Sequence, residues 1–197
     1  YTWSDWKEAL RVLRQIERYD VFFVETPLRS DDLDGYARLA DATSIRIAAG
    51  EWLTTRFEFA DLMDRGRVDV AQGDVGRVGG LTEAMRVVEM ALDRGKVIVP
   101  HCWKTGIGVS ATAHLAAAAA NCRFIEFLPP SVAESALRRD LVNEELQIQD
   151  GRLALPSRPG LGIELNREAL QSFASHAEAY AKRRQSARLP QRVNALT

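Results

Sequence analysis

The sequence predicts an α/β fold in which parallel strands alternate with helices. Short apolar runs recur through the first two thirds of the chain, and each is followed by a segment with helical or turn character. Such alternation is typical of a parallel sheet. The runs begin near residues 21, 45, 68, 97 and 123, a spacing that suits a (β/α)₈ barrel. Five units cannot close a barrel of eight strands, so the sheet is either open or the later part of a barrel.

The individual elements follow from the apolar patterns and their end signals. The first helix has Trp6, Leu10 and Leu13 at helical spacing, and Thr2 or Ser4 can cap its start. The expected strands are 21–24, 45–49, 68–72, 97–99 and 123–125. The expected helices are 2–18, 31–40, 57–65, 82–94 and 109–120.

The pattern changes after Pro129-Pro130. The segment 146–155 alternates about Asp150-Gly151, which predicts a β-hairpin with a two-residue turn. Asn166 can cap a helix that runs to about Lys182, with one apolar face formed by Leu170, Phe173, Ala177 and Tyr180. We expect barrel units in 1–130, the end of the barrel with the hairpin and helix in 131–182, and a solvated or partner-docked tail in 183–197.

Composition argues against several classes of protein. The net charge of -1 gives no reason to expect nucleic acid or an acidic membrane surface as a partner. No run of 18 apolar residues is present, so no membrane span is expected. The two cysteines, Cys102 and Cys122, form neither a disulfide framework nor a zinc pattern, and we expect both to be buried. The expected location is the cytoplasm.

A titratable side chain stands at the end of each predicted strand. In chain order these residues are Glu25, Glu51, Asp74, His101 and Glu126. One carboxylate after a strand is commonly a helix cap, but five such residues in a parallel barrel converge on one mouth. Four crowded carboxylates repel one another unless a cation neutralises them or some stay protonated. Oxygen ligands favour a hard cation such as Mg²⁺, and a His beside an Asp is the usual oriented general base.

The motifs around these strand ends resemble those of one enzyme family. The chain is similar to the mandelate racemase and muconate lactonizing enzyme group of the enolase superfamily, from Tyr1 to about Phe173. The matching motifs are Phe23-Val24-Glu25-Thr26-Pro27, Ala49-Gly50-Glu51-Trp52-Leu53, Gln72-Gly73-Asp74 with Gly76-Arg77-Val78-Gly79-Gly80, Pro100-His101-Cys102-Trp103-Lys104-Thr105-Gly106, and Ile125-Glu126-Phe127.

The resemblance implies a metal site that this chain holds only in part. Glu25 and Glu51 match two of the three carboxylates with which the family binds Mg²⁺, and the third ligand is expected upstream of Tyr1. The family's Lys-bearing strand and its capping domain are expected there too. The chain is therefore expected to be the C-terminal portion of a longer enzyme, which needs the missing N-terminal portion for a complete site. The segment after Pro156 would return toward the capping domain.

The resemblance also implies the residues that move the proton. Asp74 and His101 match a dyad in which the His acts at the carbon beside a carboxylate. Glu126 matches the acidic residue that hydrogen-bonds the substrate carboxylate as it becomes an enediolate. Lys104 could contact an anionic substrate or be solvated, and Trp103 could wall the pocket or pack on the barrel rim.

These expectations together favour a Mg²⁺-dependent lyase that dehydrates a sugar acid to a 2-keto-3-deoxy acid. The expected partner is this small carboxylate, and the protein is expected to be a homo-oligomer, as the family usually is. Racemisation or epimerisation of a 2-hydroxy acid is the alternative, and it needs a second base on the opposite face. A noncatalytic remnant or assembly module also stays open if Tyr1 is the true start.

Overall fold

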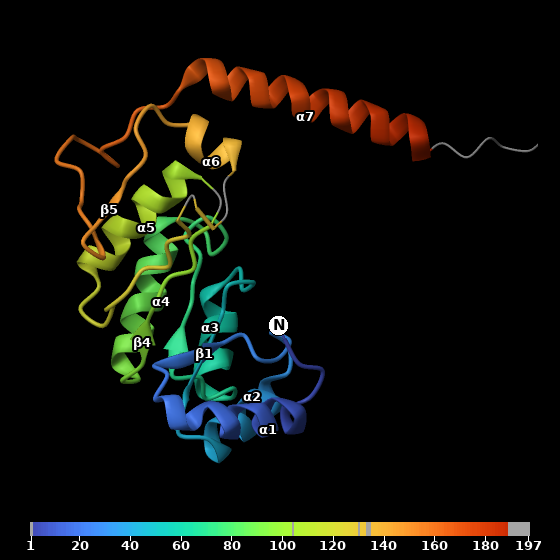
Figure 1. The fold of residues 1–197 in the computed structure, drawn as a ribbon, viewed down its shortest axis with the longest axis vertical. Helices are drawn as coiled ribbons and strands as arrows, with labels where there is room; N and C mark the ends of the chain where they lie inside the picture. The colour runs from blue at the N-terminus through green and yellow to red at the C-terminus, as the bar shows by residue number, and fades with distance from the viewer. Residues whose placement is uncertain (1, 104, 130, 133–134, 189–197) are drawn as a thin grey trace, which may run out of the picture.

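Four parallel strands form the centre of the molecule in its computed structural model (Figure 1). They are hydrogen-bonded in chain order, as β1 (Phe23–Glu25), β2 (Arg46–Ala49), β3 (Val70–Ala71) and β4 (Val97–Ile98). Every neighbouring pair is parallel, so each connection crosses back along the sheet. The structure describes residues 2–103, 105–129, 131–132 and 135–188.

Helices make these crossings and cover the outer face of the sheet. They are α1 (Trp6–Ile16), which is extended by the 3₁₀ turn Glu17–Tyr19, α2 (Leu33–Ala42), α3 (Arg56–Asp64), α4 (Leu81–Asp93) and α5 (Gly106–Ala118). The main core lies between sheet and helices, where Leu39, Ile47 and Leu62 are at most 1% exposed. A small second cluster contains Ala48, Val70 and Val99. The sheet therefore has two apolar faces, as a barrel wall requires.

Side-chain caps set where the helices begin. Asp5 accepts two backbone N–H bonds at 2.8 and 3.0 Å, so α1 begins at Trp6 and the expected caps Thr2 and Ser4 are wrong. Asp32 caps α2 and Thr55 caps α3, the latter in a reciprocal capping box. Each cap satisfies a backbone donor that the helix leaves unpaired, which makes these boundaries a local property of the sequence.

The predicted strand 123–125 does not form a regular strand. Cys122 makes a single parallel bridge with Ile98, and the Glu126 N–H donates to the Pro100 carbonyl at 3.3 Å. The segment thus runs beside β4 with too few hydrogen bonds for a ladder. Its far side meets no further strand in the described part of the chain, so it is held from one side only. Cys122 is accordingly only partly buried, and the expected burial is confirmed for Cys102 alone.

The C-terminal elements confirm the predicted hairpin and show one helix that was not predicted. β5 (Ile148–Gln149) and β6 (Arg152–Leu153) pair antiparallel. The turn residues Asp150 and Gly151 have φ of 50° and 71°, the left-handed values that such a turn needs. The unpredicted helix is α6 (Ala136–Asp140). Its five residues are too few to show an apolar period in the sequence.

The last helix, α7 (Arg167–Arg188), starts where predicted and ends later. Asn166 accepts the Ala169 N–H at 3.0 Å, which confirms it as the cap, and the helix continues past Lys182. The first residues of the expected tail 183–197 are therefore helical, and those from 189 on lie outside the described residues. Figure 1 shows α7 projecting away from the sheet and its helices. No helix in the described residues is both long and apolar enough to cross a membrane.

Candidate active site

The strand order gathers the predicted site residues around one side chain, His101. Its Nδ1 lies 2.8 Å from Asp74 Oδ2. Its Nε2 lies 3.1 Å from Glu51 Oε2 and 3.8 Å from Glu126 Oε2. Each of these residues follows a different strand or the bridged segment, because parallel strands point their carboxyl ends to the same edge. The expectation that the strand ends meet is therefore confirmed for these four.

The dyad of His101 and Asp74 is buried and oriented. The two residues are 5% and 8% exposed. Asp74 uses one oxygen for His101 and the other to accept the Gly76 N–H at 2.7 Å. A carboxylate beside Nδ1 favours the tautomer that carries a proton there, which leaves Nε2 as the atom that can accept one. This Nε2 faces Glu51 and Glu126.

Interactions around the dyad raise the pKa of His101 and lower the pKa of Asp74, so that the ionised forms of both residues are favoured. Burial acts to lower the pKa of His101, but the hydrogen bond to Asp74 and the carboxylates of Glu126 and Glu51 outweigh it and raise the pKa above its usual value. Burial acts to raise the pKa of Asp74, but hydrogen bonds from His101 and the Gly76 N–H hold it below its usual value. The site therefore stabilises a proton on His101.

At Glu25, unlike at Asp74, burial outweighs the hydrogen bond that stabilises the ionised form, so the pKa is raised. Burial is the largest cause of its raised pKa, and repulsion from Glu126 and Glu51 adds to it. The Gln72 side chain and His101 oppose this rise. A carboxyl whose pKa is raised by burial and by like charges is stabilised in its ionised form by a nearby cation.

Carboxylate oxygens are suitable ligands for a hard divalent cation, but this chain supplies only some of the ligands that such a cation needs. Glu25 and Glu51 offer oxygen donors of the kind that Mg²⁺ prefers. No group of three or more His, Cys, Asp or Glu side chains is placed to hold a metal among the residues described. Glu51 is instead directed at His101. The residues present fit such an ion only together with a ligand from elsewhere.

Glu126 is fixed by the turn that follows β4. The Cys102 N–H donates to its Oε2 at 2.9 Å, and the Trp103 indole N–H donates to its other oxygen. The Trp103 ring lies parallel to that of His101, with centroids 6.1 Å apart and planes at 9°. The structure thus places the half-exposed Trp103 beside the dyad. The other predicted contact, Lys104, lies outside the described residues.

Two residues beside the cluster belong to the matching motifs, but no role was assigned to them from the sequence. Gln72 is 1% exposed and interacts with Glu25. Arg77 donates to the backbone carbonyl of Glu51 at 2.6 Å and places its guanidinium over the Trp52 ring, 4.3 Å from the centroid. Gln72 stands two positions before Asp74, and this period of two could have identified it. The role of Arg77 could not be predicted from the sequence, because its hydrogen-bond partner is a backbone oxygen, which every residue carries.

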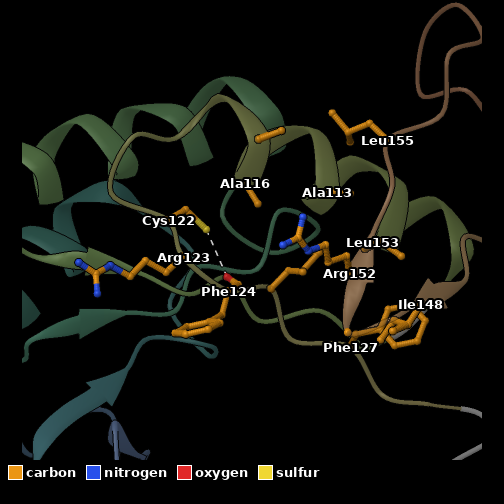
Figure 2. A pocket seen from close by; sticks show the side chains of 13 residues that line it. Ala113, Ala116, Cys122, Arg123, Phe124, Phe127, Ile148, Arg152, Leu153 and Leu155 are labelled. Carbon is orange, nitrogen blue, oxygen red and sulfur yellow. Dashed lines mark hydrogen bonds between the residues drawn. The ribbon is translucent and has the colours of Figure 1, made fainter.

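The pocket drawn in Figure 2 lies apart from this cluster. It has a volume of about 410 Å³, and its walls come from α5, the segment 122–127 and the β5–β6 hairpin. Apolar side chains line much of it, including Phe124, Phe127 and Leu153, with Arg152 reaching toward α5 (Figure 2). Its lining includes none of the strand-end residues discussed above.

The fold and the site together define a class of protein. A parallel sheet in chain order, with helical crossovers and a titratable cluster at the carboxyl ends of its strands, is the later part of a (β/α)₈ barrel. Residues 2–169 match the family model described as enolase C-terminal domain-like. The chain belongs to the enolase superfamily, of which it covers the C-terminal portion of the barrel.

Curated relatives include enzymes that act on sugar acids. The chain is 35% identical over 167 residues to arabinonate dehydratase from Saccharolobus solfataricus, covering 85% of this chain and 44% of that protein. It is 32% identical over 166 residues to D-galactonate dehydratase from Xanthomonas campestris pv. campestris, covering 83% and 44%. The chain therefore spans less than half the length of these curated relatives.

Solved structures agree with the fold. The 3,6-anhydro-D-galactonate cycloisomerase from Zobellia galactanivorans superposes with a TM-score of 0.78 at 34% identity, covering 85% of this chain and 46% of that one. The L-talarate dehydratase from Polaromonas sp. JS666, solved with Mg and L-glucarate, gives a TM-score of 0.74 at 31% identity, covering 86% and 44%.

Proposed function

We propose that the protein carrying this chain is a Mg²⁺-dependent lyase that converts a sugar acid into a 2-keto-3-deoxy acid and water. One observation carries the proposal. A buried His–Asp dyad presents His101 Nε2 to the carboxylates of Glu51 and Glu126, 3.1 and 3.8 Å away. The names of the relatives support the substrate class, since several are dehydratases of sugar acids.

In this proposal His101 is the base for the first step. The C–H bond beside the substrate carboxylate breaks, the proton passes to Nε2, and the electron pair moves into the carboxylate to give an enediolate. The buried Asp74 stabilises the resulting imidazolium, consistent with the raised pKa of His101. The hydroxyl on the next carbon then leaves as water after taking a proton from the same dyad, and the enol product becomes the 2-keto-3-deoxy acid.

The base alone does not account for such a reaction. A general base contributes about 10²- to 10⁴-fold, whereas a proton beside a carboxylate is very weakly acidic. Glu25 and Glu51 would hold the Mg²⁺, whose charge would stabilise the substrate oxygens as they become negative. The Cys102 N–H and the Trp103 indole N–H donate to the two oxygens of Glu126. In this proposal Glu126, in its protonated form, would donate a hydrogen bond to the substrate carboxylate as negative charge develops on it.

A second candidate reaction uses the same first step. A structure described as that of a putative racemase is among the solved structures similar to this chain. If the enediolate is reprotonated from its opposite face, the outcome is racemisation or epimerisation. That outcome needs a second base, which the cluster around His101 does not supply from its own side.

The test is proton NMR in D₂O on the protein at its natural length, with a panel of sugar acids and with or without Mg²⁺. We expect loss of the α-proton signal with appearance of a 3-deoxy product, and we expect His101→Asn to abolish both. Exchange without elimination would favour the racemase or epimerase. Calorimetric titration that detects no Mg²⁺ binding would overturn the roles given to Glu25 and Glu51.

A further inference from the structure

A buried arginine on the short helix α6 holds the chain directly after Glu126. Arg138 donates from Nε to Glu145 and from Nη1 to the Leu128 carbonyl. Its guanidinium also lies over the Phe127 ring, 4.7 Å from the centroid. The side chains of Arg138 and Glu145 are only 5% and 8% exposed. Arg138 therefore contacts both of the residues that follow Glu126.

Helix α6 is packed closely on α5, which gives Arg138 a fixed support. Gly106, the first residue of α5, lies so near that a Cβ atom there would come within 2.5 Å of Val142 and 3.3 Å of the Arg138 carbonyl. Leu141 and Val142, which directly follow α6, are 6% and 3% exposed. Because α5 begins where the turn after β4 ends, α6 is held beside that turn.

Arg138 also lies near the turn that binds the carboxylate of Glu126. The Cys102 N–H in this turn donates to Glu126 Oε2 at 2.9 Å. Burial raises the pKa of the Cys102 thiol, and the positive charge of Arg138 opposes that rise. Since the effect of a charge falls with distance, this opposition agrees with the guanidinium lying close to the turn. Arg138 is thus near both chain segments between which Glu126 is held.

Stability alone is a weak explanation for this buried ion pair. Removing two charges from water costs free energy, and apolar residues of similar volume often stabilise a core equally well. The third guanidinium nitrogen, Nη2, is buried without a hydrogen-bond partner among the residues described, which adds to the cost. A planar guanidinium, however, directs its N–H groups along fixed directions, so it defines the position of its partners.

We propose that Arg138 is a positioning residue for Glu126. By fixing the chain directly after Glu126, it places the carboxyl group where the Cys102 N–H and the Trp103 indole bind it. In that place Glu126 Oε2 lies 3.8 Å from His101 Nε2. The catalytic consequence rests on the proposed function, in which Glu126 donates to the substrate carboxylate. The structural consequence is independent of that function.

Hydrogen exchange followed by mass spectrometry tests the structural consequence on the protein at its natural length. Arg138→Lys keeps the positive charge but offers a single nitrogen in place of the two that form the hydrogen bonds. Peptides containing the Cys102 and Glu126 amides should exchange about 10-fold faster, because both amides donate in the held arrangement. Peptides from β2 and β3 should keep their rates. Unchanged exchange at Cys102 and Glu126, or an equal increase in all of these peptides, would overturn the proposal.

The neighbouring arginine supplies a matched control. Arg139→Lys makes the same substitution one position further along α6, where the side chain is 54% exposed, and should leave exchange unchanged. Phe127→Leu is a second test variant, which keeps every charge and removes the ring beneath the guanidinium. It should accelerate exchange at the same two amides by a smaller factor. If Arg138→Lys fails to fold, an absence of this acceleration in Phe127→Leu would overturn the proposal.

A double-mutant cycle tests the catalytic consequence. Arg138→Lys should lower kcat by about 10-fold or more. The same change made on Glu126→Ala should lower it by less than about 2-fold, because the side chain that Arg138 places is already gone. Equal losses in both backgrounds would show a general structural role and overturn the positioning role. Unchanged turnover of Glu126→Ala would instead reject the part of Glu126 in the proposed function, and hydrogen exchange would still decide whether Arg138 fixes this segment.

Discussion

Helices α2, α3 and α7 all carry apolar residues at helical spacing, yet only α2 and α3 bury them. Leu39 and Leu62, on α2 and α3, are at most 1% exposed because each helix packs on the sheet. Leu170 and Tyr180 on α7 are 47% and 62% exposed. A helical period therefore shows that a helix has a face to cover but not what covers it. In the barrel portion the cover is the chain itself, and the same packing places the strand ends that form the site.

The largest expected effects are losses of turnover at the strand ends. His101→Asn removes the proposed base and should lower kcat by about 10²- to 10⁴-fold. Glu51→Gln should cost at least as much, because the proposed cation stabilises more of the developing charge than the base does. Steady-state kinetics on the natural-length protein measures both, with the α7 variant Gln171→Glu as the unaffected control. Near-normal turnover of Glu51→Gln would remove it from the metal site.

A pair of leucine truncations would test the contrast in burial. Leu62→Ala opens a cavity in the main core and should lower the free energy of unfolding by about 2–5 kcal/mol. Leu170→Ala removes the same atoms from an exposed face of α7 and should change this free energy by no more than about 0.5 kcal/mol. Urea denaturation measures both changes. A large loss for Leu170→Ala would show that α7 packs within its own chain.

The Cys102 thiol offers a chemical measure of burial next to the dyad. Burial raises its pKa to about 11, from a usual value of 9.0. Because the thiolate is the reactive form, a thiol with a raised pKa stays protonated and unreactive until the pH approaches that value. At about pH 8.5, alkylation of Cys102 by iodoacetamide should be about 100-fold slower than for an ordinary thiol.

The comparison thiol for this experiment is placed on α7. In a Gln171→Cys variant the introduced thiol lies on the exposed outer face, and mass spectrometry can follow both sites in one sample. Urea should make Cys102 react as fast as the introduced thiol, since unfolding removes the burial. Equal rates in the native protein would contradict the burial of the turn after β4.

The smallest expected effects come from removing helix caps. Thr55→Ala removes the capping box of α3 and should lower the free energy of unfolding by about 1 kcal/mol, because α3 belongs to the main core. Asn166→Ala removes the cap of α7, which stands apart from that core. It should reduce helix content measured by circular dichroism while leaving the urea midpoint of the barrel portion unchanged. A shared midpoint shift would show that α7 and the barrel unfold together.

The sequence by itself determined the features that depend on neighbours along the chain. Strand and helix alternation, the hairpin at Asp150-Gly151 and the Asn166 cap all rest on backbone preferences and on hydrogen bonds that span a few residues. The order of charged strand ends was also readable, because parallel strands must end at one edge. These signals were enough to identify the later part of a barrel and its family.

Only the tertiary structure decided which of those strand ends touch, and how. His101 lies 3.1 Å from Glu51, and Trp103 is directed at Glu126, through contacts between segments separated by more than twenty residues. Arg77 donates to the backbone carbonyl of Glu51. The segment 122–126 forms no regular ladder, because its one pairing among the described strands is a single bridge to β4. Such long-range contacts depend on how several elements pack at once, which no local pattern encodes.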